Sequence, residues 1–105
     1  MAIKIGNIRT FKPDGSITIK VDRSSPLGNP FYMCNESVRD YVCDNYERYF
    51  DNTVRVRHTI FTNEVDRIVE LAKTNDITLL CWCYPKRCHA ETIKRHIECQ
   101  LKSEE

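Results

Sequence analysis

The sequence has no excess of charge of one sign and no long apolar run. Sixteen lysines and arginines stand against fifteen aspartates and glutamates, which gives a formal net charge of +1. This balance excludes binding of bulk nucleic acid through overall charge, because such binding needs a basic protein or a concentrated basic patch. No segment approaches the roughly 18 consecutive apolar residues of a membrane-spanning helix, so we expect no membrane association.

Export signals, internal repeats and low-complexity linkers are also missing from the sequence. We therefore expect a cytoplasmic protein. A chain of 105 residues suits one domain with a single modest core. Its six cysteines are expected to remain thiols, because disulfides are rare in the cytoplasm.

Hydrophobic periodicity predicts a small α/β domain that spans residues 1–105. Alternating residues predict strands at 3–5 and 16–22, joined as a β-hairpin by the Lys12-Pro13-Asp14-Gly15 turn, with a bulge at Gly6. The apolar run 77–83 predicts a central strand covered on both faces. Helical spacing predicts three helices, at 36–51, 63–74 and 88–101.

Two further features complete the expected fold. Alternation of valine and arginine over 53–60 predicts a short edge strand, and Arg39 is placed on the solvent face of the first helix. A sheet of three or four strands keeps at least one open edge, which proteins often cover by assembly. We therefore expect a homo-oligomer, either a dimer or a tetramer.

The junction between the central strand and the last helix is the first candidate site. Lys86 and Arg87 stand just before the helix, followed by Cys88 and His89. The first backbone N–H groups of a helix lack partners within it and carry the positive end of its dipole, which suits a phosphate. The alternative is a solvated turn whose two cations face water.

The segment 23–31 is the second candidate site. Two prolines and a glycine within it exclude regular structure. Arg23 is placed for a phosphate, Gly28 allows the backbone to approach a ligand closely, and the Asn29 amide both donates and accepts. Ser25, Gly28 and Asn29 would hold a ribose or base. The alternative is an ordinary loop in which Asn29 bonds to its own backbone.

The cysteine and histidine cluster leaves two other chemistries open. Cys81, Cys83, Cys88 and His89 are zinc-type ligands, but their spacing does not fit the common zinc patterns. A thiol at a helix N-terminus is activated as a nucleophile, and His89 with Glu91 would supply acid–base help. We expect no metal and no cofactor.

The two candidate stretches together resemble a family of small bacterial and phage proteins of unknown function. The resemblance lies in R-x-S-x-x-G-N-P-F at 23–31 and C-W-C-x-P-x-x-C-H at 81–89, with Ser24 and Leu27 departing from the usual residues. It also includes Asn7, Arg9, Arg39 and Tyr46. The resemblance implies no settled activity. The occurrence of such proteins in phages implies counter-defence, in which the protein sequesters a cyclic-nucleotide immune signal in the host cytoplasm.

The leading hypothesis is non-catalytic binding of a small phosphorylated nucleotide. Arg23, Lys86 and Arg87 would take the phosphate, and Cys88 and His89 would complete the same pocket. One alternative is a nucleotide or nucleoside hydrolase or transferase that uses this pocket. Another is a thiolate–metal structural module that binds a protein partner. The sequence leaves open whether the ligand is converted.

Overall fold

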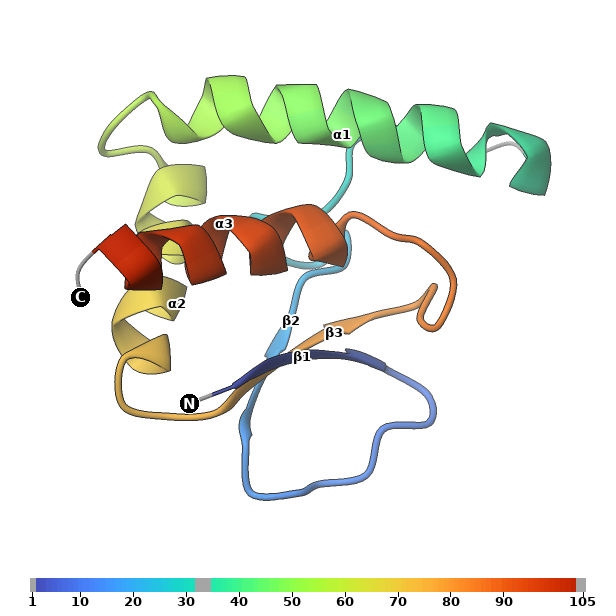
Figure 1. Ribbon diagram of the computed structural model, residues 1–105. Helices are drawn as coiled ribbons and strands as arrows, with labels where there is room; N and C mark the ends of the chain where they lie inside the picture. Colours follow the sequence, from blue (N-terminus) through green and yellow to red (C-terminus); the bar gives the residue numbers. More distant parts are fainter. Residues whose placement is uncertain (1, 32–34, 104–105) are drawn as a thin grey trace.

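A computed structural model gives the fold and describes residues 2–31 and 35–103 (Figure 1). The expected α/β class is confirmed, with three strands in one sheet and three α-helices. The elements in chain order are β1 (Ile3–Asn7), β2 (Ile17–Lys20), the short 3₁₀-helix η1 (Glu36–Val38), α1 (Arg39–Val54), α2 (Ile60–Ala72), β3 (Ile77–Cys81) and α3 (Ala90–Ser103).

The three strands lie in the order β1-β3-β2, and both outer strands run parallel to β3. Direct pairing of β1 with β2 in a hairpin is therefore wrong, although the two strands do follow each other along the chain. All five residues of β3 are buried. A strand that is apolar on both faces takes the central place, where its backbone pairs on both edges.

The connection between β1 and β2 covers the sheet face opposite to the helices (Figure 1). Gly6 pairs in register with Leu80 inside β1, so the expected bulge is wrong. A Cβ at this position would lie 2.9 Å from Cδ1 of Phe11 and 3.2 Å from Cδ2 of Leu80. The glycine is therefore needed for the close approach of this connection to the sheet.

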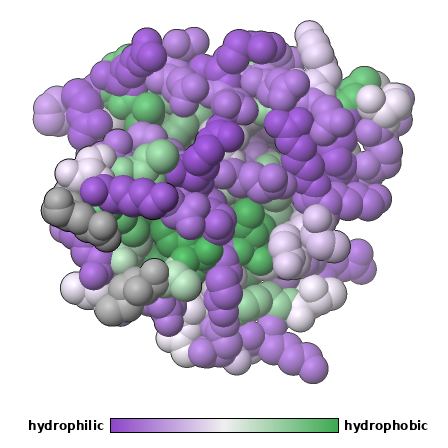
Figure 2. All heavy atoms as spheres, in the orientation of Figure 1, coloured by the Kyte–Doolittle hydropathy of each residue, from purple (hydrophilic) through white to green (hydrophobic). Residues whose placement is uncertain are grey.

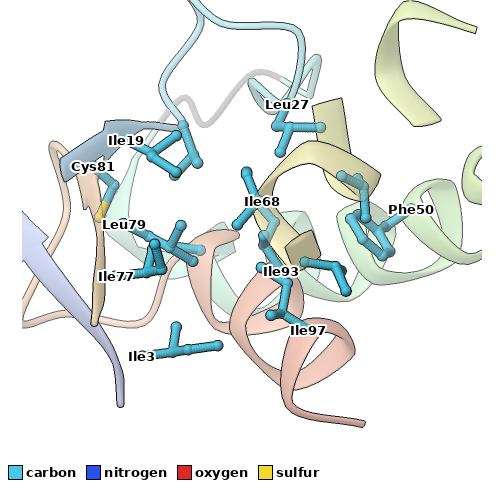
Figure 3. Packing of buried hydrophobic residues seen from close by; sticks show 14 of the residues in the cluster. Ile3, Ile19, Leu27, Phe50, Ile68, Ile77, Leu79, Cys81, Ile93 and Ile97 are labelled. Carbon is cyan, nitrogen blue, oxygen red and sulfur yellow. The ribbon is translucent and has the colours of Figure 1, made fainter. Parts of the chain in front are cut away.

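The helices cover the other face and enclose the main core (Figure 3). Ile3, Ile77 and Leu79 point from the strands toward Ile93 and Ile97 of α3. Helix α3 packs directly on β1 and β3, and α1 contacts both α2 and α3. Burial of these side chains supplies the main driving force for folding, at about 25 cal/mol per Å² of apolar surface.

Residues 53–60 do not form the expected edge strand. Thr53 and Val54 end α1, and α2 begins at Ile60, three residues earlier than expected. The Thr59 hydroxyl caps α2 by accepting the Thr62 N–H at 3.0 Å. The valine–arginine alternation falls in a turn between two helices. Val56 is 57% exposed there, so the valines of this segment do not form the buried face of a strand.

Figure 2 shows hydrophilic residues over most of one face, with apolar residues gathered near its centre. Among the helices in the described residues, none is long and apolar enough to cross a membrane.

A buried tyrosine fastens the 23–31 loop to α1. The Tyr46 hydroxyl donates to the Leu27 carbonyl oxygen at 2.8 Å, and both side chains are fully buried. This contact joins an irregular segment to the core, so the loop has a fixed position beside the helix. The hydroxyl is paired within the protein, and burial raises the pKa of Tyr46 far above its usual range.

We expect Tyr46→Phe to lower the free energy of unfolding by about 1–3 kcal/mol, because it leaves a buried carbonyl without a donor. Tyr49→Phe is the matched control, since within the described residues its hydroxyl makes no hydrogen bond, and its effect should stay within about 0.5 kcal/mol. Urea unfolding of both variants measures the difference. Equal effects would contradict the anchoring role of Tyr46.

Candidate functional site

A cavity of about 340 Å³ opens where the 23–31 loop, α1 and the residues after β3 meet. We call residues 82–89, which connect β3 to α3, the corner. The polar and aromatic side chains that line the cavity are Asp22, Arg23, Asn29, Phe31, Arg39, Trp82 and His89. The two stretches singled out in the sequence therefore contribute to one site.

Two of the expected ligand-binding residues shape the 23–31 loop and do not line the cavity. The Ser25 hydroxyl donates to the Asp22 carbonyl at 2.9 Å and accepts the Leu27 N–H at 3.2 Å. A Cβ on Gly28 would lie 2.5 Å from the Arg23 Cα, so only glycine fits against this backbone. Ser25 and Gly28 thus hold the turn that presents Arg23.

Arg23 and Asn29 line the cavity with donors to spare. Arg23 is exposed, donates once to the Phe31 carbonyl at 3.2 Å, and forms no ion pair with any described residue. The Asn29 side-chain oxygen accepts the Phe31 N–H at 2.8 Å, as the alternative of an ordinary loop anticipated. Its NH₂ group makes no hydrogen bond to any described residue and remains a donor.

Hydrogen bonds from neighbouring strand ends hold the corner. The Asn7 amide donates to the carbonyls of Trp82 at 3.0 Å and Tyr84 at 2.9 Å. The Trp82 indole N–H donates to the Asp22 carboxylate at 3.1 Å, while the side chain remains 55% exposed. Hydrogen bonds from Ser24 and then Trp82 lower the pKa of Asp22. An aromatic ring and a carboxylate are therefore fixed at the cavity rim.

Lys86 and Arg87 point to α1 and its preceding turn, outside the cavity lining. Arg87 forms ion pairs with Asp40 at 3.0 Å and Asp44 at 2.8 Å, and these carboxylates raise its pKa. Lys86 pairs with Glu36 at 3.3 Å. The two cations are thus neutralised within the protein, which leaves them poorly placed for a ligand in the cavity.

Arg39 is the cavity residue that the sequence did not single out as a ligand-binding group. Its expected place on the solvent face of α1 is wrong, because its side chain is only 14% exposed. The guanidinium pairs with Glu36 at 2.7 Å and donates to the Arg87 carbonyl at 2.9 Å. Arg39 is the first residue of α1, and its burial depends on the turn before the helix. The helical spacing of apolar residues therefore could not predict it.

The N-terminus of α3 is already occupied by the protein's own groups. The Glu91 carboxylate accepts the Cys88 N–H at 3.1 Å, and the Thr92 N–H bonds to the His89 carbonyl at 3.1 Å. These contacts satisfy donors that would otherwise face an anion and place a negative charge beside them. The expected helix-terminus phosphate site thus has little donor capacity left.

His89 is a buried, neutral imidazole. Its Nε2 atom hydrogen bonds to the Val21 carbonyl, and its ring packs edge-on against Tyr46 at 5.0 Å between centroids. A carbonyl accepts only, so Nε2 carries the proton and Nδ1 has the free lone pair. Burial lowers the pKa of His89. Within the described residues, no hydrogen bond joins His89 to Glu91, whose carboxylate caps α3.

The described cysteines are free thiols. Cys43, Cys83 and Cys88 line the cavity. Across residues 2–31 and 35–103, no group of three or more His, Cys, Asp or Glu side chains is placed to hold a metal ion. Among the described cysteines, Cys81 and Cys88 are in contact, with their sulfur atoms 3.0 Å apart.

The lowered pKa of His89 predicts a pH-dependent stability. The unfolded chain binds more protons than the folded protein as pH falls through the ordinary histidine pKa near 6.5, so stability must fall there. The hydrogen bond to the Val21 carbonyl and then the Asp22 charge oppose this effect, but burial outweighs both, and His96 adds to it because burial also lowers its pKa. Urea unfolding between about pH 7.5 and 5.5 should show a shallower slope for His89→Gln than for the wild type. Equal slopes would contradict a buried neutral His89.

Comparison with protein families gives one result and assigns no activity. The family described as Domain of unknown function (DUF4326) matches residues 7–99. No match was found among curated proteins or among solved structures. The match includes the 23–31 loop, α1, β3 and the corner, and therefore every side chain that lines the cavity. The chain thus belongs to the DUF4326 family, whose function is unknown.

Proposed function

We propose that the cavity binds a small phosphorylated nucleotide and does not convert it. The observation that carries this proposal is the meeting of three kinds of group in one cavity of about 340 Å³. These are guanidinium groups on Arg23 and Arg39, amide and carboxylate groups on Asn29 and Asp22, and the exposed indole of Trp82. Each kind matches a different part of a nucleotide.

Phosphate would bind at Arg23 and Arg39. Arg23 has most of its five N–H donors unused, and no described carboxylate pairs with it. Arg39 uses three donors on Glu36 and the Arg87 carbonyl and also interacts with the Cys83 thiol, which fixes its guanidinium plane and leaves at most two N–H groups for a ligand oxygen. Arginine suits this task because its planar fork matches phosphate oxygens and stays charged.

The nucleoside part would lie between the corner and the loop. The Trp82 ring offers an exposed face for stacking on a base, held by its hydrogen bond to Asp22. Asp22 accepts from a ribose hydroxyl or an amino group, and the Asn29 NH₂ group donates to a base or sugar oxygen. The acidic Asp22 and the donors of Asn29 thus complement groups that a bare phosphate lacks.

The size of the cavity favours one nucleotide unit. Pockets for small ligands span roughly 300–1,000 Å³, and this cavity is at the lower end of that range. A cyclic mononucleotide is compact and carries one phosphate charge, so it suits the two arginines. In its most specific form, the proposal is a phage counter-defence protein that sequesters a cyclic-nucleotide immune signal in the host cytoplasm.

The polar groups at the cavity favour binding over catalysis. His89 is neutral, and its Nε2 proton is committed to Val21, while Glu91 caps α3. Within the described residues, the expected acid–base pair of His89 and Glu91 is therefore not formed. The outer edges of β1 and β2 stay unpaired in the described sheet, which supports the proposed assembly into a dimer or tetramer.

Variants of the loop should separate charge recognition from base recognition. We expect Arg23→Ala to weaken all phosphorylated nucleotides by roughly 10- to 100-fold, because it removes charge-assisted hydrogen bonds. Asn29→Ala should reduce discrimination between bases and change phosphate binding little. Isothermal titration with a panel of linear and cyclic mononucleotides measures both effects.

Two arginine controls test where the phosphate binds. Arg95→Ala removes an exposed arginine that pairs with Glu47 outside the cavity, so nucleotide affinity should stay unchanged. Arg87→Ala should also have a small effect, because its partners are Asp40 and Asp44. A loss for Arg87→Ala equal to that for Arg23→Ala would contradict the assignment of phosphate to Arg23 and Arg39.

Recovery of the ligand separates the binder from the enzyme. Wild-type protein in excess is incubated for hours with each nucleotide, then denatured, and the nucleotide is identified by chromatography and mass spectrometry. We expect every bound nucleotide to return chemically intact. Converted nucleotide that disappears in His89→Ala or Cys88→Ala, with binding retained, would contradict the proposal and establish the hydrolase or transferase alternative.

A further inference from the structure

Two neighbouring thiols, Cys88 in the cavity lining and Cys81 beside it, are not used in the proposed nucleotide binding. Cys81 ends β3 and Cys88 stands two residues before α3, and their sulfur atoms lie 3.0 Å apart. Both side chains are buried, with Cys81 1% exposed and Cys88 4% exposed. Among the described cysteines, this is the one pair with a sulfur–sulfur contact. Two sulfur atoms so close need to approach by only about 1 Å to reach a disulfide bond.

We propose that Cys81 and Cys88 form a redox-active dithiol that a small hydroperoxide converts to an intramolecular disulfide. Cys88 is the reacting thiol, because it lines the cavity that opens to solvent. Cys81 is the resolving thiol, because it lies behind Cys88 and is not part of the cavity lining. The oxidant class follows from access, since hydrogen peroxide is small enough to enter a cavity of about 340 Å³.

The local structure supports a thiolate at this pair. A hydrogen bond from Cys88 lowers the pKa of Cys81, as do the backbone N–H groups of Tyr84 and Cys83, although burial opposes them. The same contact raises the pKa of Cys88, which holds the shared proton. The thiolate at rest is therefore on Cys81, and Cys88 becomes the nucleophile when its proton moves across this contact to Cys81. Access to the cavity, and not its own pKa, assigns Cys88 as the reacting thiol. Thiolate is the form that peroxide oxidises.

The reaction balances in two steps. The Cys88 thiolate attacks one peroxide oxygen, the O–O bond breaks, and hydroxide leaves with the Cys81 proton as water. This gives a sulfenic acid on Cys88 and a thiolate on Cys81. The Cys81 thiolate then attacks the Cys88 sulfur, the S–S bond forms, and hydroxide leaves and takes a solvent proton. The two sulfur atoms lose two electrons in total, and one peroxide becomes two waters.

Selectivity follows from the arrangement of the other thiols. Cys43 and Cys83 also line the cavity, but neither has a described sulfur partner within hydrogen-bond distance, so a sulfenic acid there has no resolving thiol in contact. Cys99 is exposed on α3 and lies outside the cavity lining. The pair should therefore close to a disulfide before the other described cysteines oxidise further.

Peptide mapping after mild oxidation tests the proposal. The reduced protein is treated with equimolar hydrogen peroxide, remaining thiols are alkylated, and the chain is cleaved by trypsin, which cuts after Lys86 and Arg87 between the two cysteines. We expect two peptides joined through Cys81 and Cys88 that separate on treatment with dithiothreitol. Tandem mass spectrometry of the wild-type peptides distinguishes Cys81 from Cys83, so the result does not depend on a variant that folds.

Matched variants give a second readout. Cys83→Ser should keep the link, whereas Cys81→Ala should abolish it and drive Cys88 on to the sulfinic acid, because the resolving thiol is gone. A Cys83–Cys88 link, a Cys88 sulfinic acid in wild-type protein with Cys81 still alkylated, or oxidation confined to Cys99 would each overturn the proposal. None of these measurements uses a nucleotide, so the result is independent of the proposed ligand.

Discussion

The site depends on the parallel arrangement of three strands around a fully buried centre. Because β1 and β2 both run parallel to β3, all three carboxyl ends meet at one edge of the sheet. Hydrogen bonds connect these ends: Asn7 holds the Trp82 and Tyr84 carbonyls, and Trp82 holds the Asp22 carboxylate. Parallel sheets commonly bind ligands at this edge, where loops rather than regular structure follow the strands. The cavity forms here because the 23–31 loop and α1 close over the same edge.

Charge pairing inside the protein decides which cations remain for a ligand. Asp40 and Asp44 lie four residues apart on α1 and therefore on one face of it, which lets both carboxylates contact Arg87. Glu36 pairs with Lys86 and Arg39. Arg23 has no such partner among the described residues, so it is the cation with the most unsatisfied donors at the cavity. The electrostatic character of the site thus results from neutralisation of its neighbours as well as from its own groups.

Much of the fold was predictable from the sequence because buried apolar residues recur at the regular spacing of a strand or a helix. The apolar run of β3 indicated a central strand, and helical spacing located α1, α2 and α3 to within a few residues. The hairpin was wrong because a proline–glycine turn specifies a local reversal but not which strands pair. The edge strand over 53–60 was wrong because short alternation also occurs in an exposed turn between helices.

The site was predictable in its location and less so in its residues. Arg23, Asn29, Cys88 and His89 line the cavity, in line with the sequence prediction, because loops after strand ends converge on one edge. Ser25 and Gly28 shape the loop, and Lys86 and Arg87 are paired with acids that are distant in the sequence. Contacts of that range depend on how α1 packs beside the corner, which no local pattern encodes. The role of Arg39 depends on the same packing.

The single tryptophan allows a direct test of the central claim, that a nucleotide binds in this cavity. Trp82 gives one indole N–H resonance in a nitrogen-15 NMR spectrum, and that group donates to Asp22 at the rim. Titration with cyclic and linear mononucleotides should shift this resonance saturably, together with the Asn29 side-chain amide. The amides around Arg95, which pairs with Glu47 of α1 outside the cavity lining, should stay unchanged. No shift of the Trp82 indole at millimolar nucleotide, or shifts confined to residues outside the cavity, would contradict the account.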